Sequence, residues 1–179
     1  MHFVKTLLKL TQMRLSNKLE MDVFSLRNTI YNAVVAVKIE AEEKSITLNC
    51  STEPPVDKIF GNSFSIEEAV TNLLLNAIKY TPANGNVEIN AKDHGNYVLV
   101  EIIDTGIGIP EDELGEIFDE FFRASNARKV EKDGTGLGLS IAKEIIQRHG
   151  GNIWVDSREG FGTKFSFTLP KSNLSKNVS

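Results

Sequence analysis

The apolar run from Tyr97 to Asp104 (Tyr-Val-Leu-Val-Glu-Ile-Ile-Asp) constrains the fold of this chain more than any other segment. Because it is almost continuously hydrophobic, it predicts a strand in the centre of a sheet. The preceding strand, Val87–Lys92, is joined to it through Asp93–Asn96, a turn with a glycine that is typical of a β-hairpin. The next stretch, 105–138, is rich in glycine, charge and isolated aromatic residues. So long a stretch between regular elements is typical of a functional lid or a disordered linker.

Hydrophobic periodicity predicts the other elements. One predicted helix begins after Ser25 and has Ile30, Val34, Val37 and Ala41 on one face. A second runs from Asn62 or Ser63 to about Tyr80, and a third runs from Leu139 to His149. The further predicted strands are Met21–Phe24, Ser45–Thr52, Asn152–Asp156 and Thr163–Leu169. Because strands and helices alternate only loosely, this order predicts an α+β fold. We expect a two-layer α/β sandwich with a mixed sheet and helices on one face.

Composition excludes several classes of protein. The chain has 179 residues and a net charge of −4 with no basic block, so it is a poor candidate for nucleic-acid binding. An anionic ligand would have to be held by local geometry. The single Cys50 excludes an internal disulfide and fits a reducing compartment. No segment approaches the roughly 18 apolar residues of a membrane span, and no signal peptide is recognisable. We therefore expect a cytoplasmic protein, which could be the cytoplasmic part of a membrane-bound sensor.

The glycine-rich segment Gly134-Thr-Gly-Leu-Gly-Leu-Ser140 opens a predicted helix. Closely spaced glycines let backbone amides approach a ligand, and a helix N-terminus adds free N–H groups and a positive dipole end. The expected guest is a phosphate chain, although a plain flexible turn has the same composition. The segment is neither a Walker A loop nor a dinucleotide fingerprint, because it lacks the lysine of the first and the third glycine of the second.

A second motif, Asp104-Thr-Gly-Ile-Gly108, ends the central strand. The carboxylate could accept a hydrogen bond from an exocyclic amine such as that of adenine. Gly106 and Gly108 would let a flat ring approach the backbone. An aspartate that simply forms a turn after a strand is the alternative interpretation.

A third group of polar residues lies on the helix that ends near Tyr80. The spacing of Asn72, Asn76 and Lys79 places them on neighbouring turns of one face. Amide oxygens suit Mg²⁺, which commonly bridges to substrate phosphates, and a lysine could neutralise those phosphates. A solvated polar face is the alternative, but asparagine is a poor helix former and needs a reason to occur twice in mid-helix.

Inside the long stretch lies Ile117-Phe-Asp-Glu-Phe-Phe-Arg123, followed by Arg128, Lys129 and Lys132. The phenylalanines could anchor the loop to the core or cover a nucleotide. The cations could form a solvated basic loop or belong to a lid that reaches terminal phosphates when it closes.

In this order, these segments resemble the ATP-binding catalytic domain of two-component sensor histidine kinases. Those domains belong to the gyrase, Hsp90, histidine kinase and MutL (GHKL) ATPase superfamily. Asn72–Pro82 resembles the N box, Asp104–Pro110 the G1 box, Ile117–Arg123 the F box, Gly134–Ser140 the G2 box and Gly160–Thr163 the last turn. The similarity runs from about Asp22 to Pro170.

The resemblance implies a Bergerat fold that binds ATP and Mg²⁺. Asn76 would ligate Mg²⁺ with the help of Asn72, Lys79 and Arg123 would contact phosphates, and Tyr80 would pack near the ribose and base. Asp104 would hold the adenine amine, assisted by Thr163 through its hydroxyl and water, and 109–135 would form the ATP lid. The remaining nucleotide-binding positions implied by the boxes are Gly106, Gly108, Ile109, Gly134, Thr135, Gly136, Leu137, Gly138 and Leu139.

Hydrolases of the superfamily carry a glutamate where this chain has Asn72, which is a poor base. The site is therefore expected to hold ATP and deliver its γ-phosphoryl group elsewhere. His2, His94 and His149 do not match the family's phosphoacceptor pattern. The acceptor histidine is thus expected on the dimerisation domain of the parent kinase, which would be a homodimer that phosphorylates a response regulator receiver domain in turn.

The ends of the chain complete the expected domain organisation. Phe3–Leu15 has the apolar spacing of an amphipathic helix that could pack on its own domain or on a partner. It resembles the end of a dimerisation-domain helix. We expect residues 1–20 to be that remnant with a linker, 21–170 to be the catalytic domain, and 171–179 to be a disordered tail. A nucleotide-binding regulatory module and an anti-sigma-type serine kinase remain alternative functions.

Overall fold

The computed structural model describes residue 11 and residues 20–53, 58–132 and 134–171. Its main sheet has five strands in the order β2-β4-β5-β7-β6, so the apolar strand β5 (Tyr97–Asp104) lies in the centre as predicted. The other strands are β2 (Thr47–Thr52), β4 (Asn86–Asp93), β6 (Ile153–Arg158) and β7 (Gly162–Pro170). β2 pairs with β4 in parallel and the remaining neighbours are antiparallel, which makes the sheet mixed.

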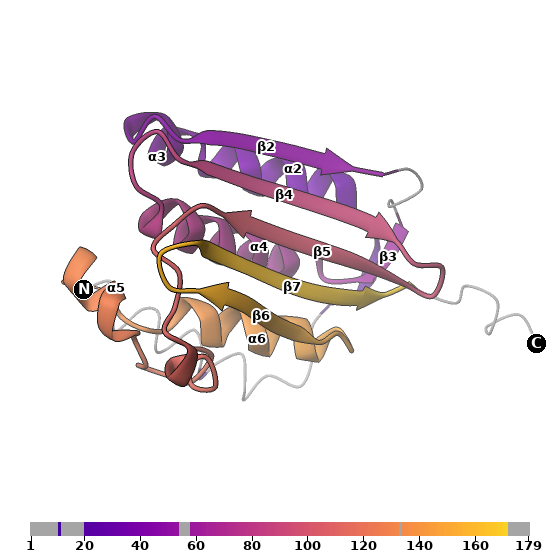
Figure 1. Cartoon of the computed structure of the whole chain (residues 1–179). Helices are drawn as coiled ribbons and strands as arrows, with labels where there is room; N and C mark the ends of the chain where they lie inside the picture. The colour runs from indigo at the N-terminus through magenta and orange to yellow at the C-terminus, as the bar shows by residue number, and fades with distance from the viewer. Residues whose placement is uncertain (1–10, 12–19, 54–57, 133, 172–179) are drawn as a thin grey trace, which may run out of the picture.

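Long helices cover one face of this sheet (Figure 1). They are α2 (Leu26–Ala36), α4 (Ser63–Tyr80) and α6 (Gly138–Arg148). The side chains of Ser25 and Asn62 accept hydrogen bonds from Asn28 N and Ser65 N and so cap α2 and α4, close to the predicted starts of these helices. Alternate residues of β4 and β5 point into the core that these helices close. The predicted α+β sandwich with helices on one face is therefore confirmed.

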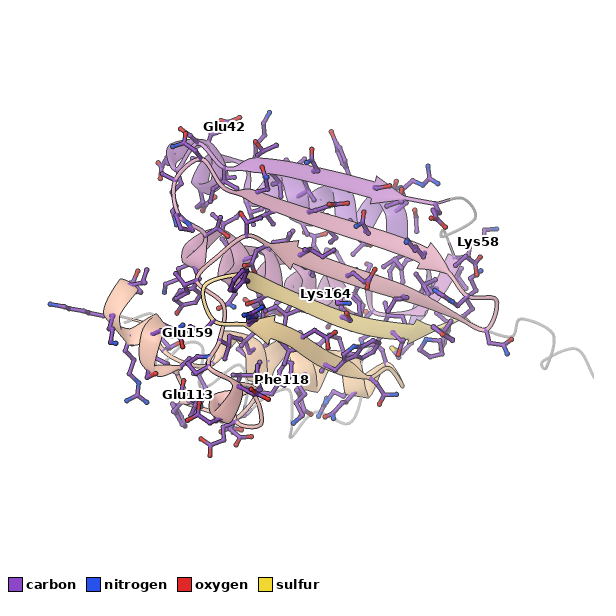
Figure 2. The ribbon with its side chains drawn as sticks, in the orientation of Figure 1. Glu42, Lys58, Glu113, Phe118, Glu159 and Lys164 are labelled. Carbon is purple, nitrogen blue, oxygen red and sulfur yellow. The ribbon has the colours of Figure 1, made fainter. Side chains whose placement is uncertain are left out.

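The opposite face of the sheet carries polar side chains. Lys164 of β7 lies on it (Figure 2), with its Nζ atom 3.7 Å from Glu101 Oε1 and 3.5 Å from Asp156 Oδ2. These partly exposed pairs contribute little to stability.

Several elements differ from the prediction. β1 (Asp22–Ser25) pairs with a strand that the sequence did not reveal, β3 (Lys58–Gly61), in a separate two-stranded sheet. The helix expected to continue from Ser25 to Ala41 is interrupted at Val37, and α3 (Lys38–Glu43) follows. The long stretch after β5 contains a 3-10 turn, η1 (Glu111–Glu113), and a short helix, α5 (Ser125–Val130).

The chain ends fall largely outside the described residues. Apart from residue 11, the helix expected over Phe3–Leu15 lies outside the described residues, as does the tail beyond Lys171. Lys171 itself belongs to the fold, because its N–H donates to Asn96 O at 2.9 Å and its Nζ pairs with Asp93. Among the described residues, no helix has both the length and the hydrophobicity of a membrane span.

His149 links the end of α6 to the start of α4. The ring is buried, Nδ1 donates to Ile145 O at 2.7 Å, and Nε2 accepts from Asn62 N at 3.0 Å. Burial lowers the pKa of His149 below its usual value, because a charged ring would lose hydration there. With both ring nitrogens engaged and the ring enclosed, His149 cannot act as an accessible phosphoacceptor.

We predict that His149→Ala lowers the free energy of unfolding at pH 7 by about 2–4 kcal/mol, since it removes a buried ring and two hydrogen bonds. Because the pKa of His149 is lowered in the native state, that state binds the proton less well than the unfolded state does. The free energy of unfolding therefore decreases as the pH falls below about 6.5. Urea unfolding between pH 5 and 8 measures both effects. The exposed His94→Ala serves as control and should stay within about 0.5 kcal/mol. An acid-side slope unchanged by His149→Ala would contradict the assignment.

Candidate functional site

A cavity of about 290 Å³ opens between the end of α4, the end of β5, the lid (residues 109–135) and the start of α6. The predicted site residues that line it are Asn72, Asn76, Lys79, Tyr80, Asp104, Gly108, Ile109, Arg123, Gly134, Thr135, Gly136, Gly138, Leu139 and Thr163. These residues come from distant parts of the sequence, and the fold brings them together at one place. Two predicted positions, Gly106 and Leu137, do not line the cavity.

One wall of the cavity is the polar face of α4. Asn72 and Asn76 are half-buried, and neither amide makes a hydrogen bond with the described residues. Lys44 donates from Nζ to Ile78 O at 2.8 Å and to Lys79 O at 2.9 Å, which satisfies carbonyls at the end of the helix. Lys79 Nζ lies 5.8 Å from the centre of the Tyr80 ring. The wall therefore presents two amides without partners beside a cation.

Asp104 forms the opposite end. Its side chain is 7% exposed, and Oδ1 accepts from Gly106 N at 2.8 Å and from Thr163 N at 3.2 Å. Both bonds end on the same oxygen, so Oδ2 has no hydrogen-bond donor among the described residues. Burial raises the pKa of Asp104 to about 6, although the two backbone donors oppose the shift. The carboxyl is therefore held in place by the backbone, with one acceptor oxygen left for a ligand.

Ser157 is a supporting residue that the sequence motifs did not reveal. Its Oγ donates to Gly162 O at 2.9 Å and accepts from Ile109 N at 3.0 Å. Thr163 Oγ1 lies 2.9 Å from the same Oγ and has to be the donor, because the Ser157 proton is already used. The Thr163 hydroxyl is thereby oriented with its lone pairs free, and the start of the lid is tied to β6.

The glycines after β5 are required by close contacts within the protein itself. A Cβ on Gly106 would lie 2.6 Å from Asp104 Oδ1 and 2.7 Å from Tyr80 O. A Cβ on Gly108, which has φ +67°, would lie 2.0 Å from Arg158 O. Both glycines therefore make room for the protein's own backbone and carboxylate. Of the two, only Gly108 also lines the cavity.

The glycine-rich segment leads into α6 as predicted. α6 has no side-chain cap and no acidic residue in its first turn, and its first residues, Gly138 and Leu139, line the cavity. Its free N–H groups and dipole can therefore act on an anion. The side chain of Leu137 is fully buried in the core, so only its backbone is left to contact a ligand.

The lid is anchored to the core by aromatic residues. The Phe118 ring packs edge-on against Phe165 with the ring centres 6.1 Å apart, and Figure 2 shows Phe118 beside the end of the sheet that carries β6. Phe122 packs against the core and lines the cavity. Of the two interpretations of these phenylalanines, the structure favours anchoring for Phe118. Phe121 is exposed and has φ 65°.

The lid adds lining residues that the motifs did not identify. Asn126 of α5 donates from Nδ2 to Gly108 O at 3.0 Å, and Glu113 Oε2 accepts from Ser125 N at 2.8 Å. Both bonds hold α5 over the cavity. The other unpredicted lining residues are Leu75, Ile107, Ile117, Ala124 and Ala127.

Three lid contacts involve the predicted phosphate cations, Lys79 and Arg123. Glu131 Oε2 lies 3.7 Å from Lys79 Nζ. Arg123 donates from Nη1 to Lys132 O at 2.9 Å and from Nη2 to Glu131 O. Burial raises the pKa of Tyr80, and the nearby Arg123 charge and hydrogen bond partly oppose that rise.

Among the described residues, no group of three His, Cys, Asp or Glu could hold a metal ion. Any metal here would depend on amides and on the oxygens of a ligand.

Residues 61–173 match the family model described as histidine kinase-, DNA gyrase B- and HSP90-like ATPase. Sensor histidine kinase WalK from Bacillus subtilis (strain 168) is 45% identical over 107 residues, which cover 59% of this chain and 18% of WalK. The catalytic domain of histidine kinase ThkA has a TM-score of 0.75 and 32% identity, covering 86% of this chain and 99% of that chain. Full-length ShkA, in complex with AMPPNP, has a TM-score of 0.81 and 25% identity, covering 94% of this chain and 35% of that chain. The matched part of the chain thus spans less than a fifth of the length of WalK.

Proposed function

This chain belongs to the family of histidine kinase-, DNA gyrase B- and HSP90-like ATPases, and we propose that it binds ATP with Mg²⁺ and donates the γ-phosphoryl group to a histidine on a separate domain. One observation carries the proposal. In the described part of the chain, two amides without hydrogen-bond partners, a carboxylate with one oxygen that accepts no bond and a helix N-terminus without a side-chain cap converge on one cavity. The amides match a metal ion, the carboxylate matches the base, and the helix N-terminus matches the phosphates of a nucleotide.

The adenine end is assigned to Asp104. Its free Oδ2 accepts from the exocyclic amine, and the Thr163 hydroxyl, oriented by Ser157, offers a second acceptor directly or through water. The apolar lining residues Ile107 and Ile109 cover the ring, and Tyr80 packs beside the ribose and base. The complex of ShkA with AMPPNP, an ATP analogue, supports a nucleotide as the ligand of this fold.

The phosphate end is assigned to α4, the lid and the start of α6. The donor set fits Mg²⁺, because Asn76 and Asn72 offer hard amide oxygens and the ligand's phosphates can supply the others. The ion, when bound, neutralises charge on the phosphates. Lys79 and Arg123 contact phosphate oxygens, and the backbone of Gly134–Leu139 receives the chain of phosphates at the helix N-terminus.

Delivery of the phosphoryl group to a partner follows from the groups near the phosphate end. Asn72 occupies the place of a base and cannot deprotonate water, so the site holds ATP for transfer. His149 is buried, and His94 lies in the β4–β5 turn, stacked on Tyr97 with the ring centres 5.1 Å apart. We therefore infer that the acceptor histidine lies on the dimerisation domain of the parent kinase. We further infer that the parent kinase is a homodimer, that this segment of it is cytoplasmic, and that the kinase then phosphorylates a response regulator.

Titration with ATP tests the first half of this proposal. We expect binding with Mg²⁺, weaker binding when the metal is chelated, and no sustained release of phosphate from the same sample. Steady turnover of ATP by the isolated chain would contradict the role of Asn72. An affinity for ATP that does not depend on Mg²⁺ would contradict the role of Asn76.

The raised pKa of Asp104 predicts a pH dependence of base binding. The carboxylate form accepts from the adenine amine, so affinity should fall as the pH drops through about 6. At pH 5 the carboxylate is about one-tenth populated, and adenosine, which has no phosphate to titrate, should bind about tenfold more weakly than at pH 8. In Asp104→Asn, which cannot titrate, the slope should vanish. A slope that survives in the asparagine variant would show that another group causes it.

A further inference from the structure

Glu131 lies between the cations that the proposed function reserves for phosphates. It follows α5 in the lid, where its N–H donates to Ala127 O at 3.1 Å and ends the helix. From there its side chain reaches Lys79 of α4, with 3.7 Å between Oε2 and Nζ. Its backbone carbonyl accepts from Arg123 Nη2. One residue therefore contacts both cations, with its side chain and with its main chain.

This arrangement places oxygen acceptors where an anionic ligand is expected. Lys79, Arg123 and Gly134 line the cavity, and a Cβ on Gly134 would lie 3.1 Å from the Arg123 guanidinium. The guanidinium is turned toward lid carbonyls, since its Nη1 donates to Lys132 O. Its Nε is buried and has no acceptor among the described residues. The contacts of Arg123 are thus incomplete in this arrangement, as expected for a cation that has a better-matched ligand.

We propose that Glu131 competes with the phosphates of the nucleotide for Lys79 and Arg123, and so determines how strongly the site prefers phosphorylated over unphosphorylated adenosine ligands. A phosphate that takes Lys79 has to displace the Glu131 carboxylate, because both oppose the same ammonium group. Adenosine leaves the pair intact. The free energy of breaking the Lys79–Glu131 pair is therefore subtracted from the binding of ATP and not from that of adenosine.

The inference rests on the proposed function, because it takes the ligand to be an adenosine phosphate. The side chains of Lys79 and Glu131 are 35% and 38% exposed, so solvent screens the pair and its effect is moderate. We expect Glu131→Gln to tighten the binding of Mg-ATP about two- to fivefold and to leave adenosine unchanged. Glutamine keeps the size and the backbone carbonyl while removing the charge.

Glu116→Gln is the matched control, because Glu116 is an exposed lid residue with the same charge and no ion pair with Lys79. If it tightens Mg-ATP as much as Glu131→Gln does, the effect is only the net charge of the lid and the proposal is wrong. A weaker affinity of Glu131→Gln for Mg-ATP would also overturn it, since Glu131 would then support the bound nucleotide.

A double-mutant cycle tests the contact itself. In a Lys79→Met background, Glu131→Gln should no longer change the affinity for Mg-ATP, because the cation for which Glu131 and the phosphates compete is absent. A persistent effect overturns the proposal. Failure of the wild-type chain to bind either ligand would refute the proposed function, whereas equal affinities of wild type and Glu131→Gln for Mg-ATP would refute this inference alone.

Discussion

Asn76→Ala is expected to lower the rate of phosphoryl transfer by about 100- to 1,000-fold while the protein remains folded. Asn76 is half-buried on α4, lines the cavity and has no hydrogen-bond partner among the described residues. Its removal therefore breaks no hydrogen bond among the described residues, and alanine is the better helix former. The loss should appear as a lost dependence of ATP binding on Mg²⁺ and as lost transfer, with an unfolding midpoint equal to or above that of the wild type.

Asn28→Ala is the control for this substitution, because Asn28 is an exposed asparagine of α2 that lies outside the cavity lining. It should leave binding and transfer unchanged. Asn72→Ala should give a smaller loss than Asn76→Ala, since Asn72 is assigned an assisting role. Transfer by Asn76→Ala at the wild-type rate would remove the basis for the metal site.

Gly108→Ala is expected to destabilise the fold by about 3 kcal/mol and to abolish nucleotide binding. A Cβ at this position would lie 2.0 Å from the carbonyl oxygen of Arg158, so β6 or the floor of the cavity has to shift. The positive φ of +67° adds the strain that any residue with a Cβ meets there. Denaturant unfolding and titration with Mg-ATP measure the two effects.

Gly95→Ala separates strain from collision. Gly95 has a similar φ of +77°, but a Cβ there would meet nothing within 4 Å. This variant should cost only about 1 kcal/mol and should bind nucleotide normally. If the two variants were equally stable, the close approach of β6 to Gly108 would not be a determinant of the site.

Local signals explain which elements could be predicted. Ser25 and Asn62 cap their helices through contacts three residues away, and the hydrophobicity of β5 predicts its central position in the sheet. The strand β3 was missed because its two buried residues are Ile59 and Gly61, and a glycine provides no hydrophobic alternation in the sequence. The short helix α5 was missed because Ala127 is its only buried residue.

The candidate site divides in the same way. Motif spacing identified the residues that project from α4 and β5, because a helix face and a strand end follow directly from the sequence. The contacts of Ser157 with Ile109 and of Glu131 with Lys79 join separate elements, so they follow only from the three-dimensional fold. The burial of the Leu137 side chain in the core likewise follows from the fold, because the glycine-rich pattern indicates backbone contacts and not the direction of this side chain.

Phosphoryl transfer in trans tests the central claim most directly. The chain is mixed with Mg²⁺, ATP labelled at the γ-phosphate and the histidine-bearing dimerisation domain of its parent kinase. The proposed mechanism predicts label on that domain in an acid-labile, base-stable linkage, which a histidine-to-alanine variant of the same domain abolishes. Tight ATP binding with no transfer, or label in an acid-stable linkage typical of phosphoserine, would contradict it.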